Sequence, residues 1–482
     1  MFAAELRDGL IEIEEVSRFP NGGVDVDGVF RWQLRRLYEE VVAGLSMAAR
    51  AALLRGGVLV SAGIDSWAVD YGRIGTDGRL LEDPVHHRDS RTHPAFEAAI
   101  AAVGGWKLFE RSGIALLSFN TLYQLLADRS ARPEDETATV LLIPDLLGYL
   151  LTGRSAWEKT NSSTTQLLTV SREWDTELME MLSIPPSIVG DLTPPGTVLG
   201  PVSDPAALEA GVPPDLLITS VASHDTASAV LAVPAVDERF AFISSGTWSL
   251  VGVEIDEPVV TRQAFEAGYS NELGAFGKTR LLRNIMGFWP LQEVIREFEG
   301  DGVDLDLAAL MLDASSIPRF QYLIDAESSV LLTTGDMRGR IAELCGHDRP
   351  APRQPAEFAR CILDSLALAY RRAIRGIEEV AARRVDTIHI VGGGAMNEQL
   401  CQMTADACGV PVEAGPIEAA AIGNALMQFR ALDLVDDDLW GMRWMVRRSF
   451  GVLRFEPDPS QGLLWQSAEE SLSTTRVTDR LG

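Results

Sequence analysis

The fold of this chain is decided by Leu216-Leu-Ile-Thr-Ser-Val-Ala-Ser-His-Asp-Thr-Ala-Ser228, an apolar run that ends abruptly in polar side chains. The run is short and apolar enough to be a central strand, and the small residues after Asp225 let a helix begin at once. In open α/β folds, ligands bind at the carboxyl ends of such strands. The pattern therefore predicts that Asp225 faces a ligand and can accept a proton. The alternative is that Asp225 or Thr226 merely caps the following helix.

Composition limits the possible architecture and partners. A chain of 482 residues exceeds what one hydrophobic core usually organises, which predicts two domains. Its 69 acids and 42 bases give a formal net charge of -27, which repels nucleic acid and anionic lipid, so neither a nucleic-acid nor a membrane partner is expected. We expect a cytoplasmic protein, because no apolar run could span a bilayer and the first ten residues lack an apolar signal core. The four cysteines show no C-x-x-C spacing and are expected to be thiols: Cys345, Cys361, Cys401 and Cys408.

Turn residues and periodicity divide the chain into two similar halves. The first half predicts a hairpin around Asp8-Gly9, a helix with apolar positions from Leu34 to Leu45, a buried strand at 58–65 and an alternating strand through Trp67 and Tyr71. Residues 94–200 are expected to be mostly helical. A hinge is expected at 233–238, after which strands, a helix, a strand and a polar loop recur. The expected domains are 1–235 and 236–465, with a tail at 466–482.

Two glycine-containing loops in the second half are candidates for phosphate binding. Ser244-Ser-Gly-Thr247 lies between two expected strands, where hydroxyls and amides can face an anion, although an ordinary hairpin would look the same. Gly392-Gly-Gly394 leads into a helix, whose free amides and dipole favour phosphate. The alternative is a tight strand-to-helix turn, since this is neither a Walker A loop nor a dinucleotide fingerprint.

Other polar residues of the first half allow more than one interpretation. His86 and His87 could form a metal site or a catalytic dyad, but a surface or ion-paired loop is favoured. Asp65 and Asp70 are either supporting acids or structural anchors. Polar loops from both halves suit phosphoryl transfer, which needs positioning, Mg²⁺ and a base for the acceptor hydroxyl.

The chain resembles the FGGY carbohydrate kinases over nearly its whole length, and within them the branch that acts on L-rhamnulose. Two matching segments are Gly63-Ile-Asp-Ser-Trp-Ala-Val-Asp-Tyr71 and Val221-Ala-Ser-His-Asp-Thr-Ala-Ser-Ala-Val230. The others, in the same order as in the family, are 88–92, 119–125, 143–145, 151–153, 160–167, 244–250, 283–287 and 389–394.

This resemblance implies an α/β fold of two actin-like, ribonuclease-H-like ATPase domains around a central cleft, with sugar in the first domain and ATP mainly in the second. The implied reaction is transfer of phosphate from ATP, with Mg²⁺, to the 1-hydroxyl of L-rhamnulose. Another ketose, such as L-fuculose or a pentulose, and a catalytically impaired sugar- or nucleotide-binding relative stay open. The resemblance implies Asp225 as the base, sugar contacts from Ala68, His224, Thr226 and Asn284, and nucleotide contacts from Thr247, Gln292, Gly393 and Gly394. It leaves the metal ligands and the oligomeric state unassigned.

The chain departs from the family pattern at two places. Ala68 stands where the family usually has a glycine whose backbone approaches the sugar, so a methyl group could crowd that contact. The family's first strand and its Asp-Leu-Gly-x-x-Ser phosphate loop have no counterpart, because Met1-Phe-Ala-Ala-Glu-Leu looks like the strand that follows them. We expect the coding sequence upstream of Met1 to supply both; the alternative is a decayed or regulatory relative.

Overall fold

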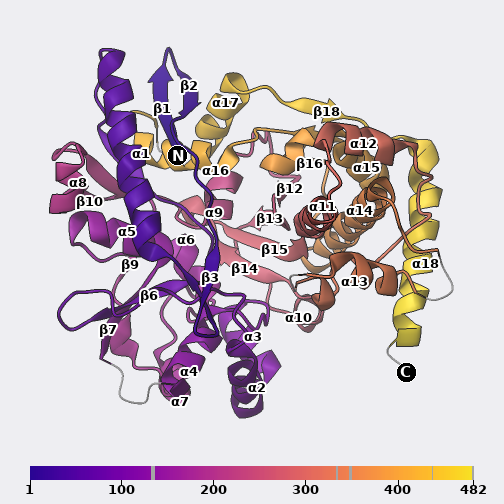
Figure 1. The fold of residues 1–482 in the computed structure, drawn as a ribbon, viewed down its shortest axis with the longest axis horizontal. Helices are drawn as coiled ribbons and strands as arrows, with labels where there is room; N and C mark the ends of the chain where they lie inside the picture. The colour runs from indigo at the N-terminus through magenta and orange to yellow at the C-terminus, as the bar shows by residue number, and fades with distance from the viewer. Residues whose placement is uncertain (132–135, 333–334, 347–349, 437, 480–482) are drawn as a thin grey trace. The chain divides into compact units, whose positions relative to one another are not determined.

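The computed structural model describes residues 1–131, 136–332, 335–346, 350–436 and 438–479, with the backbone alone for 473–479 (Figure 1). The chain forms two compact units. Unit 1 comprises Met1–Ala232, Glu254–Leu281 and Ala419–Ser449, and unit 2 comprises Val233–Val253, Leu282–Glu418 and Phe450–Gly482. The boundaries expected from the sequence, at 235 and 465, stay a prediction. Among the described helices, none combines the length and the apolar character that crossing a membrane requires.

Unit 1 begins with two hairpins and a long helix. Strands β1 (Phe2–Arg7) and β2 (Leu10–Glu15) pair antiparallel, and Asp8 and Gly9 form the turn between them at φ 52° and 74°. The predicted first hairpin is therefore confirmed. A second hairpin joins β3 (Gly23–Val26) to β4 (Val29–Trp32). Helix α1 (Leu34–Leu54) follows and buries Leu34, Leu37 and Leu45, which confirms the helix expected from their spacing.

A three-stranded sheet places the decisive strand of the sequence at its centre. The order is β10 (Thr197–Pro201), β11 (Leu217–Ser220) and β5 (Ser61–Gly63), with β11 parallel to β5 and antiparallel to β10. The buried central strand predicted at 216–222 is thus confirmed. The strand predicted at 58–65 is too long, because only Ser61–Gly63 pair with β11, and Val58 and Val60 are exposed.

The next predicted strand is also shorter than its alternation indicated. Only β6 (Tyr71–Gly75) is a strand, paired with β7 (Thr137–Leu142). Trp67 to Asp70 is not a strand, because Val69 has φ 68° and the chain turns there. Helices alternate with short strands through the rest of this region: α2 (Thr92–Val103), α3 (Gly105–Ser112), α4 (Thr121–Ala131), α5 (Ile143–Thr152), β8 (Trp157–Glu158), α6 (Lys159–Ser162), α7 (Thr176–Met181), β9 (Leu192–Thr193) and α8 (Pro205–Glu209).

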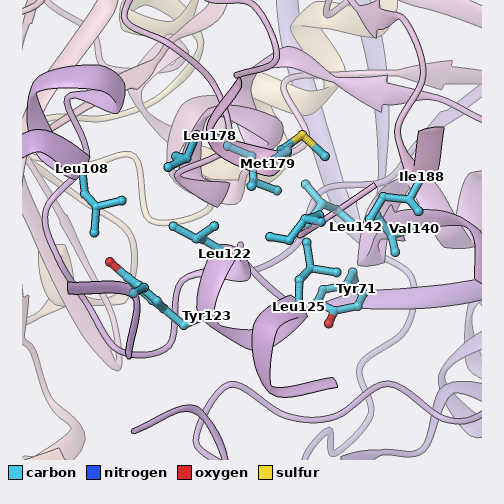
Figure 2. Packing of buried hydrophobic residues seen from close by; sticks show 13 residues of the cluster. Tyr71, Leu108, Leu122, Tyr123, Leu125, Val140, Leu142, Leu178, Met179 and Ile188 are labelled. Atoms are coloured by element: carbon cyan, nitrogen blue, oxygen red, sulfur yellow. The ribbon is translucent and has the colours of Figure 1, made fainter. Parts of the chain in front are cut away.

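One core of unit 1 packs α4 against β6 and β7 and against the segment around α7. Figure 2 shows Leu122 and Leu125 of α4 beside Leu142, with Leu178 and Met179 on the other side and Tyr123 of α4 directed toward Leu108. Burial of each such side chain contributes about 1.5–3 kcal/mol. This core fixes α4, which carries two side chains that hold the turn at Val69.

Helix α9 (Asp225–Leu231) packs closely against α16 (Ala419–Ala431) within unit 1. The approach requires glycine at 423, because a Cβ there would lie 1.8 Å from the carbonyl oxygen of Ser228. Nearby, Arg443 of α17 (Leu439–Ser449) donates to the carbonyl of Val230 at 3.1 Å and pairs with Glu254. The helix that begins at Asp225 is therefore held along its length. Unit 1 also contains α10 (Arg262–Glu266).

Among the described residues, the largest sheet has seven strands, in the order β14 (Ser270–Leu273), β15 (Thr279–Met286), β13 (Trp248–Ile255), β12 (Phe240–Ser245), β16 (Thr387–Val391), β17 (Val412–Ala414) and β18 (Leu453–Phe455). β12 runs antiparallel to β13 and parallel to β16. In unit 2, α14 (Pro355–Val380) packs against α11 (Trp289–Gly300), α12 (Leu307–Ser316) and α15 (Glu398–Cys408) (Figure 1). Helices α13 (Met337–Leu344) and α18 (Gly462–Asp479) complete the unit.

Candidate functional site

Asp225 is the first residue of α9, and its carboxylate is accessible. The residue that caps the helix is His224, without a side-chain hydrogen bond, so the alternative that Asp225 or Thr226 is the cap is wrong. The Asp225 amide donates to the carbonyl of Ser66 at 2.9 Å, and its Oδ1 accepts from Thr226 Oγ1 at 3.1 Å. The Asp225 side chain is 45% exposed. Its backbone is therefore fixed while its carboxylate is free to meet a ligand.

The loops that follow β5 and β11 lie side by side, because these parallel strands end at the same edge. Ser66 forms a bridge with His224, and the Ser66 amide donates to the carbonyl of Ser223 at 3.0 Å. Asp65 lies on the β5 loop, where its Oδ2 accepts from Asn424 Nδ2 at 2.5 Å. Burial raises the pKa of Asp65 to about 6; the Asn424 hydrogen bond opposes this rise and the Asp225 charge adds to it. The charge of the candidate base thus acts on a second, buried carboxylate.

His224 is held by a buried ion pair on one side and faces Asp225 on the other. Its Nδ1 lies 3.1 Å from Arg280 Nη2 and 3.2 Å from Glu272 Oε2. Its Nε2 lies 3.6 Å from Asp225 Oδ1. Burial raises the pKa of Glu272, but the contact with His224 and the charge of Arg280 outweigh it, so the pKa of Glu272 falls below its ordinary value. Sequence patterns did not identify Glu272 or Arg280, because no local motif links them to His224.

Glu158 is a third residue that sequence reasoning missed. It is buried at the start of α6 and accepts hydrogen bonds from Thr160 N at 2.8 Å and Asn161 N at 3.0 Å. It also accepts from Ser223 N at 3.1 Å and Ser223 Oγ at 3.0 Å. Burial raises the pKa of Glu158, and these donors only partly offset the rise. Glu158 therefore anchors Ser223, the residue immediately before His224. The sequence signal that could have identified Glu158 is its position as the N-cap of a helix.

The chain around Ala68 forms a strained turn. The Asp70 amide donates to the carbonyl of Ala68 at 2.9 Å across Val69, whose φ of 68° is rare for a β-branched residue and costs of order 1–3 kcal/mol. The Val69 carbonyl accepts from Thr121 Oγ1 at 2.8 Å and from Gln124 Nε2 at 3.2 Å. Strain that surrounding contacts maintain in this way is typical of functional sites. The strained residue directly follows Ala68, for which the family resemblance implies a sugar contact.

Asp70 anchors this turn through its carboxylate. Its Oδ2 accepts from Trp32 Nε1 at 2.7 Å, from Trp67 Nε1 at 2.9 Å and from His87 Nδ1 at 2.9 Å, and its Oδ1 accepts from Gln124 Nε2 at 3.1 Å. Burial raises the pKa of Asp70, but the His87 charge and these donors bring it below the ordinary value. Asp70 is therefore a structural anchor.

The two neighbouring histidines do not form a surface loop, so that part of their interpretation is wrong. His86 is 6% exposed, and its ring stacks on Trp32 at 4.1 Å. Burial lowers the pKa of His86 to about 3. In the described part of the chain, Asp70, His86 and His87 are the three potential metal ligands that lie within 4.8 Å of one another. The group does not suit Mg²⁺, which prefers oxygen ligands, because hydrogen-bond donors already occupy both oxygens of Asp70.

The two candidate phosphate loops of unit 2 meet where the parallel strands β12 and β16 end. A Cβ at Gly394 would lie 2.2 Å from Ser245 Oγ, and a Cβ at Gly392 would lie 2.8 Å from the Ser245 carbonyl oxygen. Only glycine therefore allows this contact. Gly393 is exposed, and a Cβ there would meet nothing within 4 Å. The loops together leave an open backbone surface of the kind that binds phosphate.

The remaining predicted residues lie near these loops or on a neighbouring strand. The amides of Phe288 and Trp289 donate to the carbonyls of Gly246 at 2.9 Å and Thr247 at 3.2 Å, which attaches the start of α11 to the first loop. Gln292 lies one turn further along α11 and is exposed. Asn284 lies on β15 and is half-buried. Unit 2 thus carries Asn284, Thr247, Gln292, Gly393 and Gly394, whereas Ala68, His224, Asp225 and Thr226 belong to unit 1.

Comparison with known proteins identifies the family. The N-terminal domain model of the FGGY family of carbohydrate kinases matches residues 28–232, and its C-terminal domain model matches residues 241–432. The rhamnulokinase of Enterococcus faecalis is 38% identical over 95% of this chain and 92% of its own. That of Oceanobacillus iheyensis is 37% identical over 96% of this chain and 97% of its own.

Solved structures agree on the fold. The ligand-bound xylulose kinase of Lactobacillus acidophilus has a TM-score of 0.79 at 15% identity, covering 97% of this chain and 93% of the other. The glycerol kinase of Plasmodium falciparum with ADP has a TM-score of 0.74 at 13% identity, with the same coverage. The predicted two-domain, actin-like α/β fold is confirmed. The chain belongs to the FGGY family of carbohydrate kinases and is a sugar kinase.

Proposed function

We propose that this protein transfers the γ-phosphoryl group of ATP to the 1-hydroxyl of L-rhamnulose and releases L-rhamnulose 1-phosphate and ADP, as a step of rhamnose catabolism. The observation that carries the proposal is the accessible carboxylate of Asp225, fixed at the start of α9 beside His224. Relatives named rhamnulokinase, at 36–39% identity, support the choice of sugar. We place the reaction in the cytoplasm, where ATP is available; none of the four cysteines, all of them in the described part of the chain, forms a disulfide, as suits a reducing compartment.

Asp225 is the proposed general base. It takes the proton of the 1-hydroxyl as that oxygen forms its bond to the γ-phosphorus, and the bond from this phosphorus to the bridging oxygen breaks to release ADP. A base for this step needs an accessible carboxylate, and the Asp225 side chain is 45% exposed. His224, Thr226, the strained turn at Ala68 and Asn284 are proposed to hold the sugar.

The glycine loops of unit 2 are the proposed nucleotide site. Their close packing on Ser245 presents backbone groups without side chains, and the space at Gly393 leaves room for a ligand. Thr247 would add a hydroxyl, Gly394 an amide, and Gln292 a side chain from the start of α11. We propose that ATP acts with Mg²⁺, which neutralises phosphate charge. Asp70, His86 and His87 do not fit Mg²⁺, so the protein ligands of the ion stay unassigned. Mg²⁺ commonly keeps substrate phosphates and water as ligands.

Substrate preference tests the proposal directly. ADP release is measured with a coupled assay on L-rhamnulose, L-fuculose, L-ribulose, D-xylulose and glycerol at equal concentrations with Mg-ATP. The highest kcat/KM for L-rhamnulose supports the proposal. A preference for glycerol or a pentulose reassigns the sugar, and a folded protein that releases no ADP with any of them refutes the proposed activity.

A further inference from the structure

Arg280 is completely buried and aims a hydrogen bond at the ring of His224. Its Nη2 donates to His224 Nδ1 at 3.1 Å. Two other contacts hold the guanidinium in place: Nε and Nη2 donate to the carbonyl of Leu273 at 3.1 Å and 3.0 Å, and Nη2 lies 3.1 Å from Glu272 Oε2. A buried arginine with this many fixed contacts has little freedom to move away from the imidazole.

We propose that Arg280 is a positioning residue that fixes neutral His224 as the tautomer with its proton on Nε2. An arginine donates hydrogen bonds and cannot accept them, so the nitrogen that it contacts must carry a lone pair. In a neutral imidazole the proton then lies on the other nitrogen. That nitrogen, Nε2, is 3.6 Å from Asp225 Oδ1. His224 therefore presents an N–H group to the proposed base and to a hydroxyl bound beside it, an inference that rests on the proposed function.

Glu272 competes with Arg280 for the same nitrogen of His224. Its Oε2 lies 3.2 Å from the same Nδ1 and would accept a proton placed there. The Nδ1 contact of Arg280 has hydrogen-bond geometry, whereas Glu272 Oε2 accepts no hydrogen bond from the described residues. Arg280 also neutralises the Glu272 charge that would otherwise attract the proton to Nδ1. The tautomer should therefore depend on Arg280 and not on Glu272.

Loss of Arg280 has a definite chemical consequence. The proton moves to Nδ1 and bonds Glu272, so Nε2 turns a lone pair toward the carboxylate of Asp225. Two lone-pair groups facing each other repel, and a sugar hydroxyl loses the donor that held it. We expect Arg280→Met to lower kcat/KM for L-rhamnulose about 10-fold, the lower end of the range known for loss of a partner that orients a metal-ligating histidine. The KM for ATP should not change.

The tautomer itself is measurable without activity. The full-length protein is labelled with ¹⁵N-histidine, and long-range ¹H–¹⁵N spectra report the protonation of each ring nitrogen. The chain has only 6 histidines, and His224 is assigned by the signals that His224→Gln removes. We expect an unprotonated Nδ1 and a protonated Nε2 in the parent and in Glu272→Gln, and a protonated Nδ1 in Arg280→Met.

Each outcome is decisive. A protonated Nδ1 in the parent, or an unchanged tautomer in folded Arg280→Met, overturns the proposal. If Arg280→Met does not fold, Arg280→Met/Glu272→Leu removes donor and acceptor together and should give a mixture of both tautomers; a single Nε2–H tautomer there would be equally damaging. Because the spectra need no turnover, an inactive parent refutes the proposed reaction and leaves the tautomer test intact.

Discussion

Replacement of Asp225 by asparagine separates a catalytic carboxylate from a structural one. Asparagine keeps the size of the side chain and can still accept the 3.1 Å hydrogen bond from Thr226, but it cannot take a proton. General-base assistance is worth about 10²- to 10⁴-fold in rate. We therefore expect kcat to fall at least about 10²-fold, equivalent to roughly 2.7 kcal/mol of transition-state stabilisation.

The structure limits how much stability the same change can cost. Asp225 is half exposed and does not cap α9, so its main contribution to folding is the attraction between its charge and the helix dipole. That attraction is worth about 0.3–1 kcal/mol. A melting temperature within about 2 °C of the parent is expected for a chain of this size. The large effect on rate and the small effect on stability together distinguish a base from an anchor.

The assay measures kcat at saturating L-rhamnulose and Mg-ATP, with thermal melting of the same samples. Asp306→Asn is the matched control, because Asp306 caps α12 in unit 2 through a 2.8 Å hydrogen bond and has no proposed part in the reaction. It should keep the parental kcat. A kcat for Asp225→Asn within about threefold of the parent, in a protein that melts normally, would refute the assignment of the base.

Three further predictions use pairs of matched changes or a pH series. Gly394→Ala places a methyl group 2.2 Å from a serine oxygen, so it should lower the free energy of unfolding by about 1–3 kcal/mol and raise the KM for ATP. Gly393→Ala places its methyl group in open space and should keep the parental melting temperature in calorimetry. Gly423→Ala should destabilise by about 3 kcal/mol or more, because its Cβ would lie 1.8 Å from a carbonyl oxygen, while Gly148→Ala, with 3.4 Å of clearance, should be neutral or stabilising in urea unfolding. The folded-state pKa of Asp65, about 6, exceeds the unfolded value of 3.8, so between these pH values the folded protein binds more protons than the unfolded one. The contribution of Asp65 to the free energy of unfolding therefore falls by about 3 kcal/mol as pH rises from 4 to 6. Asp65→Asn should flatten this part of the stability profile, and an unchanged slope contradicts the prediction.

Much of the fold follows from local sequence signals. The spacing of Leu34, Leu37 and Leu45 predicts α1, because a helix buries residues that recur every three or four positions. Asp8 and Gly9 predict the first hairpin through their tolerance of positive φ. The position of Asp225 follows in the same way, since the end of a buried strand and the start of a helix are both visible in neighbouring residues.

The failures occur where distant residues decide the conformation. The alternation through Trp67 and Tyr71 is typical of a strand, yet Val69 adopts a left-handed conformation. Hydrogen bonds from Thr121 and Gln124, about fifty residues later, hold it there. Strain cannot be recognised from the strained residue alone, because the contacts that offset its cost lie elsewhere in the chain.

The same limit explains why the sequence identified Asp225 and His224 but not the residues that hold them in place. Asp225 and His224 sit on a local strand-to-helix junction, whereas Arg280, which contacts His224, lies 56 residues further on and Asn424, which contacts Asp65, lies 359 residues from its partner. A junction can be recognised from its own residues, but the charge and hydrogen bonds around it are set by segments that meet only in the folded unit. The residues that act on a substrate are therefore easier to identify from sequence than the residues that set their protonation. Measurements of tautomer and pH dependence are accordingly the experiments in which the structure adds most to the sequence.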